Sequence, residues 1–188
     1  MLGSRLQEAG WKIRCLLLGQ LGKRGVFLKA GMLEVPSLLL LPAPQGASIV
    51  EPGSGREVGS ARWVRPGGGF LFWRPRPILE VRESDDEPLL CQIRRRGLGG
   101  QRWEVIDAEE QPVGVINRNR ILNDEGVLIG AAVWSAGRLS AVLSDLRGEE
   151  LATLIRQPQG LLITFKAARE GNPFLKMLLL ALGLAQIL

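Results

Sequence analysis

Apolar residues beyond residue 26 occur in short runs, and proline, glycine or acidic residues interrupt them every few positions. This punctuation is typical of strands joined by turns rather than of long helices. The run Ser37–Pro42 predicts a buried strand that ends at its proline. Four later segments each combine an extended stretch, a polar turn and a second extended stretch that ends near arginine. They are residues 48–63, 78–96, 103–120 and 141–157.

Each of these four segments predicts a β-hairpin, because the acidic or glycine-rich centre supplies turn residues and the flanks are β-branched or large and apolar. Two of the hairpins align without gaps. The equivalent pairs are Glu80 and Glu104, Val81 and Val105, Pro88 and Pro112, Arg94 and Arg118, and Arg96 and Arg120. Residues 70–75 and 161–167 predict further strands. A sheet of about ten or more strands must curl, and closure into a barrel removes its exposed edges.

The C-terminal segment, Asn172–Leu188, predicts the most apolar helix of the chain. Asn172 is a favourable N-cap, and Pro173 is a favourable first helical residue. A helix over residues 173–188 is about 24 Å long at ~1.5 Å per residue, which is short of a hydrocarbon core of ~30 Å. Because the helix is apolar nearly all round, we expect the interior of the barrel to enclose it. A membrane tail and a helix that docks on a partner are the alternatives.

The chain has 188 residues, of which 46% are hydrophobic and 23% are charged, so it is long enough for one domain with a core. We place this domain at residues 26–188. Residues 1–25 contain an apolar run, Cys15–Leu18, that is shorter than the ~7–15 residues of a signal-peptide core. For this N-terminal segment we expect a short amphipathic helix and no export. An interfacial membrane anchor and partial disorder are the alternatives.

The chain contains no histidine and no tyrosine. Without histidine, Ser-His-Asp and Cys-His catalysis, facial-triad iron sites and ordinary zinc hydrolase sites are excluded. The two cysteines, Cys15 and Cys91, are far apart, which argues against a disulfide framework or a zinc site and favours a reducing compartment. The acidic stretch Glu83–Pro88 lacks EF-hand spacing and predicts a hairpin turn. We therefore expect a non-enzymatic protein without cofactor or metal.

Three features together resemble a known family: acidic-turn hairpins such as WEVIDAEEQPVGVINR (residues 103–118), a final strand at residues 161–167, and an Asn-Pro start to a hydrophobic terminal helix. They resemble the phospholipid scramblase and LURP-one-related group of tubby-like proteins. The resemblance covers residues 26–188 and is strongest from Trp103 onward. It implies a mostly β fold, a closed antiparallel barrel of about twelve strands that encloses a hydrophobic C-terminal helix.

The resemblance also carries functional implications. Scramblases of the animal type have an acidic calcium-binding stretch just before the terminal helix, but the corresponding stretch here, Lys166–Phe174, has Glu170 as its only carboxylate. Calcium takes about six to eight oxygen ligands, several of them charged, so we do not expect calcium-driven lipid scrambling. Tubby proteins proper bind phosphoinositide headgroups through basic residues on the barrel wall. That chemistry is implied here as a class, and no residue-level motif carries over.

The net charge of +5 arises mostly from arginine, which favours bidentate contacts with carboxylate and phosphate. If the hairpins belong to one up-and-down sheet, the ends of their second strands lie on one rim of the barrel. Seven arginines occupy those ends, namely Arg62, Arg94, Arg95, Arg96, Arg118, Arg120 and Arg156. This rim is the candidate site for an anionic ligand. The alternative is a solvated rim whose arginines pair with the turn carboxylates of neighbouring hairpins.

The function expected from these features is a tubby-like module that binds acidic phospholipid or a phosphorylated ligand through the arginine rim. We expect it to be cytoplasmic, peripheral at the membrane, and a monomer. A barrel that binds nucleic acid or a protein partner is the alternative, because the positive charge suits either. Nucleic acid ranks lower, since the tryptophans and arginines do not alternate along the strands as stacking platforms require.

Overall fold

The structure, a computed structural model, describes residues 31–65, 67, 76–83, 88–96, 102–166 and 172–188. The chain divides into two compact units, Met1–Ala30 and Gly31–Leu188, and every described residue belongs to the second. Several predictions fall outside the described residues. They are the N-terminal helix, the strand at residues 70–75, most of the Glu83–Pro88 turn, and Glu170.

Strands make up most of the described residues. The first six are β1 (Ser37–Ala43), β2 (Gly46–Val50), β3 (Glu57–Val64), β4 (Ile78–Arg82), β5 (Leu89–Arg96) and β6 (Arg102–Asp107). The next six are β7 (Pro112–Asn117), β8 (Arg120–Asn123), β9 (Leu128–Trp134), β10 (Ser140–Ser144), β11 (Glu150–Gln157) and β12 (Gly160–Phe165). A 3-10 turn, η1, covers Met32–Glu34, and an α-helix, α2, covers Pro173–Ile187.

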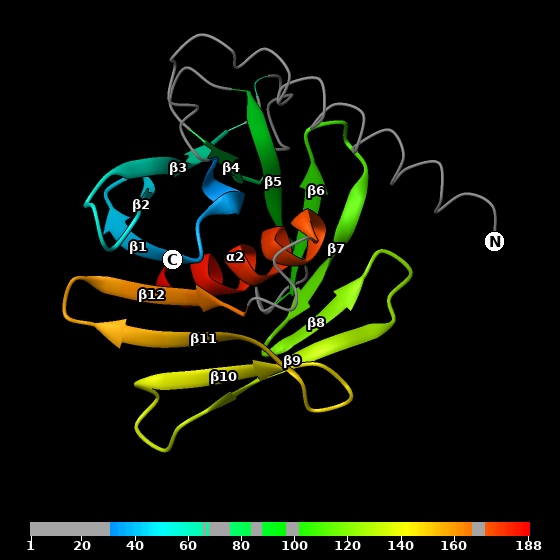
Figure 1. The fold of residues 1–188 in the computed structure, drawn as a ribbon. Helices are drawn as coiled ribbons and strands as arrows, with labels where there is room; N and C mark the ends of the chain where they lie inside the picture. Colours follow the sequence, from blue (N-terminus) through cyan, green and yellow to red (C-terminus); the bar gives the residue numbers. More distant parts are fainter. Residues whose placement is uncertain (1–30, 66, 68–75, 84–87, 97–101, 167–171) are drawn as a thin grey trace, which may run out of the picture. The chain divides into compact units, whose positions relative to one another are not determined.

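The twelve strands form one closed antiparallel barrel (Figure 1). Each strand pairs with its neighbours in sequence, and β1 closes the barrel by pairing with β12. The closing pair places Leu38 opposite Ile163 and Leu40 opposite Leu161. Closure satisfies both edges of every strand in the order, which an open sheet of this size does not achieve. The predicted fold class, a closed barrel of about twelve antiparallel strands with a hydrophobic C-terminal helix, is therefore confirmed.

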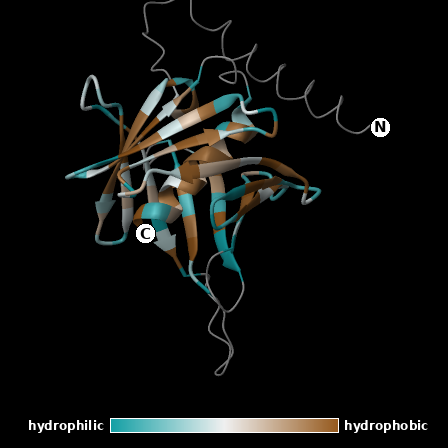
Figure 2. Cartoon of the chain, turned by 90° about the horizontal axis from the view of Figure 1, so that it is seen from below, coloured by the Kyte–Doolittle hydropathy of each residue, from teal (hydrophilic) through white to brown (hydrophobic). Residues whose placement is uncertain are grey.

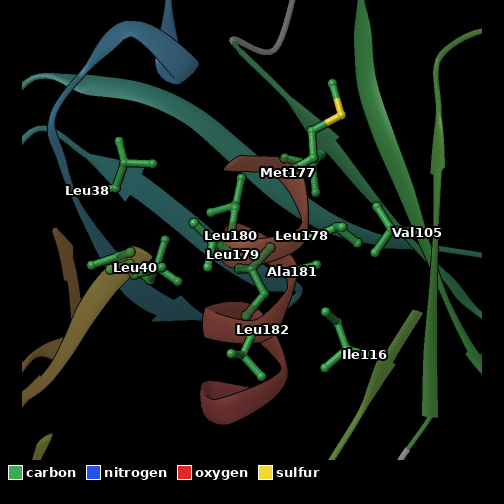
Figure 3. Close-up of a cluster of buried hydrophobic side chains, with 14 of the residues drawn as sticks. Leu38, Leu40, Val105, Ile116, Met177, Leu178, Leu179, Leu180, Ala181 and Leu182 are labelled. Carbon is green, nitrogen blue, oxygen red and sulfur yellow. The ribbon is translucent and has the colours of Figure 1, made fainter. Parts of the chain in front are cut away.

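Helix α2 lies inside the barrel, surrounded by the strands (Figure 1). All its residues from Leu175 to Leu184 are buried. Figure 3 shows the helix between Leu38 and Leu40 on one side and Val105 and Ile116 on the other. The all-round apolar surface thus has wall on every side, as the enclosed-helix prediction requires. No helix of the described chain is both long and apolar enough to span a bilayer.

The start of α2 follows the sequence prediction. The side-chain Oδ1 of Asn172 accepts a hydrogen bond from the backbone N–H of Leu175 at 3.0 Å, and Pro173 is the first helical residue. Near its other end the helix packs tightly against the closing strands. A Cβ on Gly183 would lie 2.4 Å from Cδ1 of Ile163 on β12 and 3.0 Å from Cδ1 of Leu40 on β1. The helix therefore lies directly behind the pair that closes the barrel.

The strands alternate between the core and the outside, which is the period that sheets impose. On β12, Leu161, Ile163 and Phe165 are buried, while Leu162 and Thr164 are half-buried on the outer face. Figure 2 shows hydrophobic residues along the helix and in bands along the strands, with hydrophilic residues in many of the turns. The apolar side chains of both layers therefore form one core between wall and helix.

One charged residue of α2 is buried with the core. Lys176 has only 2% of its surface exposed. Its Nζ donates to the backbone carbonyl of Leu33 in η1 at 2.6 Å and lies 5.2 Å from the ring centroid of Phe165. The 3-10 turn is fixed in its place by Glu83, whose Oε1 accepts from the N–H of Met32 at 3.1 Å. The amine thus joins the first turn of the helix to the segment that precedes β1.

The structure differs from the sequence predictions in two places. Strand β1 continues through Pro42 to Ala43. Its pairing with β12 stops at Leu40 and Leu161, so the missing N–H of Pro42 removes no hydrogen bond to β12. The pattern analysis also assigned no strands to the stretch that forms β8 and β9. Strand β8 has only four residues, and the apolar run of β9 includes Gly130, Ala131 and Ala132, which are residue types of low strand propensity.

Candidate functional site

The antiparallel order places the connections between strands alternately at two ends of the barrel. Connections that follow odd-numbered strands lie at one end, and connections that follow even-numbered strands lie at the other. The described connections after even-numbered strands contain many carboxylates. These are Glu51, Glu83, Glu109, Glu110, Asp124, Glu125, Asp145 and Glu149, together with the basic residues Arg56 and Arg147 and with Lys166, which follows β12. We call this the acidic end.

Three turns of the acidic end share one geometry. The side-chain oxygen of Asp107, Asn123 and Asp145 accepts from the backbone N–H four residues further on, at 2.7, 2.7 and 2.9 Å. In each turn the backbone N–H of the same residue also donates to the backbone carbonyl of that partner. An Asp or Asn side chain that replaces a backbone acceptor is a common way to form a tight turn. The acidic centres of the hairpins are therefore turn residues first, as the sequence predicted.

All seven candidate arginines lie at the opposite end, which we call the basic end. Arg62, Arg94, Arg95, Arg96 and Arg156 lie toward the C-terminal ends of odd-numbered strands, Arg118 lies in the β7–β8 turn, and Arg120 begins β8. Arg65, Arg76, Arg102 and Arg138, which were not among the candidates, lie at the same end. No described residue in the connections of this end is Asp or Glu. The barrel therefore carries opposite charge at its two ends.

Two of the seven arginines face the mouth of the barrel instead of its outer wall. Arg95 pairs in register with Trp103, a core residue, and its guanidinium lies 5.4 Å from the centroid of that ring. Trp63 packs beside Trp103, with ring centroids 6.2 Å apart and the rings tilted by 38°. A guanidinium over an indole gains cation–π attraction while its polar edge stays hydrated. Arg95 thus covers the top of the aromatic layer that ends the core.

Arg156 also belongs to the mouth, because it pairs with the buried Leu161. Its guanidinium donates to the carbonyl of Gln186, in the last turn of α2, at 3.2 Å and lies 5.6 Å from the ring centroid of Trp134. The last carbonyls of a helix have no partners within the helix and carry partial negative charge, so a cation is favourable there. Arg156 therefore fixes the end of the enclosed helix.

The outward arginines of β5 make polar contacts along the wall. Arg96 forms an ion pair with Glu104 of β6, with its Nη2 at 2.9 Å and its Nε at 3.0 Å from Oε2. Arg94 donates from Nη2 to Oε1 of Gln92 at 2.9 Å, and its buried Nε has no acceptor within the described residues. These contacts are to neighbours on the strands and not to turn carboxylates. The turn carboxylates lie at the acidic end, a strand length away.

Of the three remaining candidates, Arg62 lies on β3 opposite Glu80, and the other two lie in or next to the β7–β8 turn. Arg118 occupies the left-handed region with φ 56° in the turn between β7 and β8, and Arg120 is the exposed first residue of β8. Strand β7 ends at Asn117, so Arg118 and Arg120 do not have the places on a strand that Arg94 and Arg96 have. The gapless alignment of the two hairpins is therefore wrong at its last two pairs. It holds at Val81 and Val105, both of which are fully buried.

Two features of this arrangement, the tryptophans at the basic end and the burial of Lys176, were not predicted from the sequence. The tryptophans Trp63, Trp103 and Trp134 gather at the basic end, where two of them contact arginines. Trp63 ends one predicted hairpin and Trp103 begins another, so their position near strand termini could be read from the sequence, although their inward direction depends on register. The buried position of Lys176 had no sequence signal, because one lysine in an apolar helix reads as a solvent-facing residue.

The buried thiol of Cys91 is poorly placed for nucleophilic chemistry. Cys91 is fully buried, and this burial, with a smaller contribution from the charge of Asp107, raises the pKa of its thiol to about 12. A thiol with that pKa is protonated near neutral pH and is a weak nucleophile. Within the described ranges no group of three or more Asp, Glu or Cys side chains is arranged to hold a metal ion. The basic end is therefore the best-defined chemical feature of the surface.

Comparisons with known proteins find a similar fold and no matching family. No protein-family model matches the chain, and no curated protein matches it. A protein from Arabidopsis thaliana, known from an X-ray structure, is similar in three dimensions with a TM-score of 0.50. The match covers 69% of this chain and 78% of that chain at 8% sequence identity. At this identity the likeness is one of fold alone.

Proposed function

We propose that the protein is a non-enzymatic, tubby-like barrel that binds acidic phospholipid headgroups through its basic end. The observation that supports this proposal is the separation of charge. Arginines gather at the end that follows odd-numbered strands, and turn carboxylates gather at the other end. The family itself, the scramblase and LURP-one-related group, belongs to the proposal, because the enclosed-helix barrel is the fold that this resemblance implies.

The chemistry of the basic end suits phosphate. Guanidinium groups form paired hydrogen bonds with phosphate oxygens, and each basic residue near an anionic membrane surface contributes about 1 kcal/mol. Arg102, Arg118 and Arg120 are all exposed on neighbouring strands or turns of this end. Because the turn carboxylates lie at the far end, they do not cancel the field of the basic end, and the barrel approaches an anionic surface with this end first. We place the protein in the cytoplasm, as a monomer that binds the membrane peripherally.

The first test is vesicle flotation of detergent-free protein. We expect binding to vesicles that contain phosphatidylserine or a phosphoinositide and no binding to neutral phosphatidylcholine vesicles. Binding should weaken steeply as salt rises, because exposed charges are screened within ~10 Å at 0.1 M salt. Equal, salt-resistant binding to neutral vesicles would contradict the proposal, since it would mean that apolar insertion alone drives binding.

A pair of charge-matched triple variants separates the basic end from net charge. Arg102→Gln with Arg118→Gln and Arg120→Gln removes three positive charges from the basic end, and Arg56→Gln with Arg147→Gln and Lys166→Gln removes three from the acidic end. We expect about a hundredfold weaker vesicle binding from the first set and little change from the second. Equal losses would mean that net charge, and not the basic end, drives binding.

Competition distinguishes the sources of phosphate. If the headgroup itself is recognised, soluble inositol phosphate at matched ionic strength displaces the protein from vesicles. If only a charged surface is recognised, it does not. Duplex DNA tests the nucleic-acid alternative, because a higher affinity for DNA than for vesicles at the same salt concentration would reverse the ranking.

A further inference from the structure

The outer wall of the barrel is chemically two-sided. Between β3 and β6 its outward residues are mostly charged or polar, and they include Arg62, Glu80, Gln92, Arg94 and Glu104. Between β9 and β1 several outward positions are apolar instead, among serine and threonine. They include Val133, Val142, Ile155, Leu162 and Leu39, on five strands that are neighbours in the barrel.

Exposure along this apolar side is greatest at the hairpin of β9 and β10. Val133 is 71% exposed and lies directly opposite Val142, which is 43% exposed. On the next strand, Ile155 is 44% exposed and is two residues beyond Thr153, the partner of Val142. Diagonal neighbours of this kind are within side-chain reach. These three residues therefore form one continuous surface.

A fourth exposed apolar residue lies at the tip of the same hairpin, at the basic end. Leu139 lies in the β9–β10 turn and is 65% exposed, and its carbonyl accepts from the backbone N–H of Arg156 at 2.7 Å. That bond anchors the turn to β11 and, by the register of β10 and β11, places Leu139 opposite Arg156. Leu139 therefore lies at the tip of the hairpin, beside the outward residues and next to the mouth. We call Val133, Leu139, Val142 and Ile155 the apolar face.

Two cations border the apolar face at the basic end. Arg138 precedes Leu139 in the same turn, and Arg120 on β8 is opposite Ala131, two residues before Val133. The described residues from Leu128 to Ser144, which form β9, its turn and β10, include no Asp or Glu. An exposed apolar centre with guanidinium groups around it matches the boundary of an anionic bilayer, where phosphates lie above hydrocarbon.

We propose that the β9–β10 hairpin inserts its apolar face into the interfacial layer of an acidic membrane while the surrounding arginines contact phosphates. This inference rests on the proposed function and adds to it the inserting element and the orientation of the barrel. Arginine contacts alone give binding that any basic surface shows. Insertion of the apolar face fixes which side of the basic end is turned toward the bilayer.

The test uses a dye that brightens and shifts to shorter wavelength in hydrocarbon. In a Cys15→Ser background, Leu139→Cys places the dye at the apolar face, and Leu146→Cys places it at the acidic end. The two positions are matched, because Leu146 is 68% exposed and also lies in a turn of β10. The remaining thiol, Cys91, is fully buried and does not compete for the label.

With phosphatidylserine vesicles we expect the shift at position 139 and none at position 146. If the labelled protein floats with the vesicles but position 139 shows no shift, insertion is overturned and the proposed function stands. If it does not float at all, both are overturned. A shift at position 139 that depends on protein concentration and needs no vesicles would assign the face to a second copy of the chain, and would also overturn insertion.

Substitution supplies a second measurement. Leu139→Gln with Val142→Thr should weaken vesicle binding about tenfold, because exposed apolar area no longer leaves water, while Leu146→Gln should leave binding unchanged. The substitutions keep every arginine, so the salt dependence of the residual binding should be that of the unsubstituted protein. Unchanged affinity for the double variant would refute insertion even if the arginine variants weaken binding.

Discussion

The guanidinium of Arg156 on β11 donates to the carbonyl of Gln186 in the last turn of α2, at 3.2 Å. The bond joins the wall of the barrel to the end of the helix that the wall encloses. At the other end of the helix, Lys176 donates to the carbonyl of Leu33. Two cations therefore tie the two ends of the helix to segments far from it in sequence.

Loss of the first of these contacts should destabilise the barrel modestly. Arg156→Gln removes the charge at the helix C-terminus and the cation–π contact with Trp134. Because Arg156 is exposed, we expect a loss of only about 1 kcal/mol in the free energy of unfolding. Urea unfolding measures it, with Arg138→Gln as the control in an exposed turn. A loss no larger than that of the control would show that the contact contributes nothing.

Buried side chains of α2 should contribute strongly to the free energy of unfolding. Leu180→Ala removes a fully buried side chain, and we expect a loss of about 2–5 kcal/mol in the free energy of unfolding. Leu139→Ala makes the same chemical change at a position that is 65% exposed, and it should cost less than about 1 kcal/mol. Similar losses in thermal or urea unfolding would contradict the enclosed position of the helix.

Removal of the helix should prevent folding. A chain that ends at Gly171 lacks α2 and leaves the inward side chains of the strands without an apolar partner. A cavity of that size is not tolerated in a protein interior. We expect aggregation, or a soluble chain without a cooperative thermal transition. A soluble truncated protein that melts cooperatively would overturn the role of the helix as core.

The recurring turn of the acidic end should be sensitive to its side-chain acceptor. Asp145 accepts from the N–H groups of both Arg147 and Glu149, at 2.8 and 2.9 Å. Asp145→Ala removes both bonds and should destabilise the protein by about 1–2 kcal/mol, while Asp145→Asn keeps an acceptor and should cost less. The control is Asp124→Ala, a carboxylate that is exposed in a neighbouring turn. Equal urea midpoints for the Ala and Asn variants would contradict the role of the side-chain acceptor.

The buried thiol gives a pH dependence with a definite sign. Burial raises the pKa of Cys91 from 9.0 to about 12, so the folded protein keeps its proton at a pH where the unfolded chain has lost it. The stability due to this proton is fully present below pH 9 and is lost as pH rises from 9 to 12. In that range the unfolding free energy should fall by about 1 kcal/mol per pH unit relative to Cys91→Ala.

That relative measurement removes the titration of the lysines, which both proteins share. A difference between the two proteins that does not change above pH 9 would contradict the raised pKa. Reactivity toward a thiol reagent gives an independent check, because Cys91 should react only after unfolding.

Much of the fold could be predicted because its signals are local. Turn residues such as Asp107 and Asp145 stand between apolar flanks, and these features predict hairpins without knowledge of the rest of the chain. The turn at Asn123 has the same geometry, but β8 beside it has only four residues and the centre of β9 is Gly-Ala-Ala, so no hairpin was predicted there.

The candidate site could be predicted only in part. Its position at one end of the barrel follows from alternation of strand direction, which a sequence of hairpins already contains. The direction in which each side chain points does not follow, because it depends on register: Arg95 is opposite Trp103, and Arg94 is opposite Glu104. A one-residue change in register exchanges the inner and outer faces, so local sequence alone could not separate mouth from wall.

The place of α2 in the chain has a consequence for the order of folding. The helix that forms the centre of the core follows all twelve strands in sequence, and the strand that closes the barrel, β12, is the last of them. A closed wall cannot admit a helix, and an open wall has nothing to pack against until the helix is present. Closure of β1 on β12 and entry of the helix must therefore occur together, which leaves much of the stabilising contact to a late, non-local step and favours slow folding.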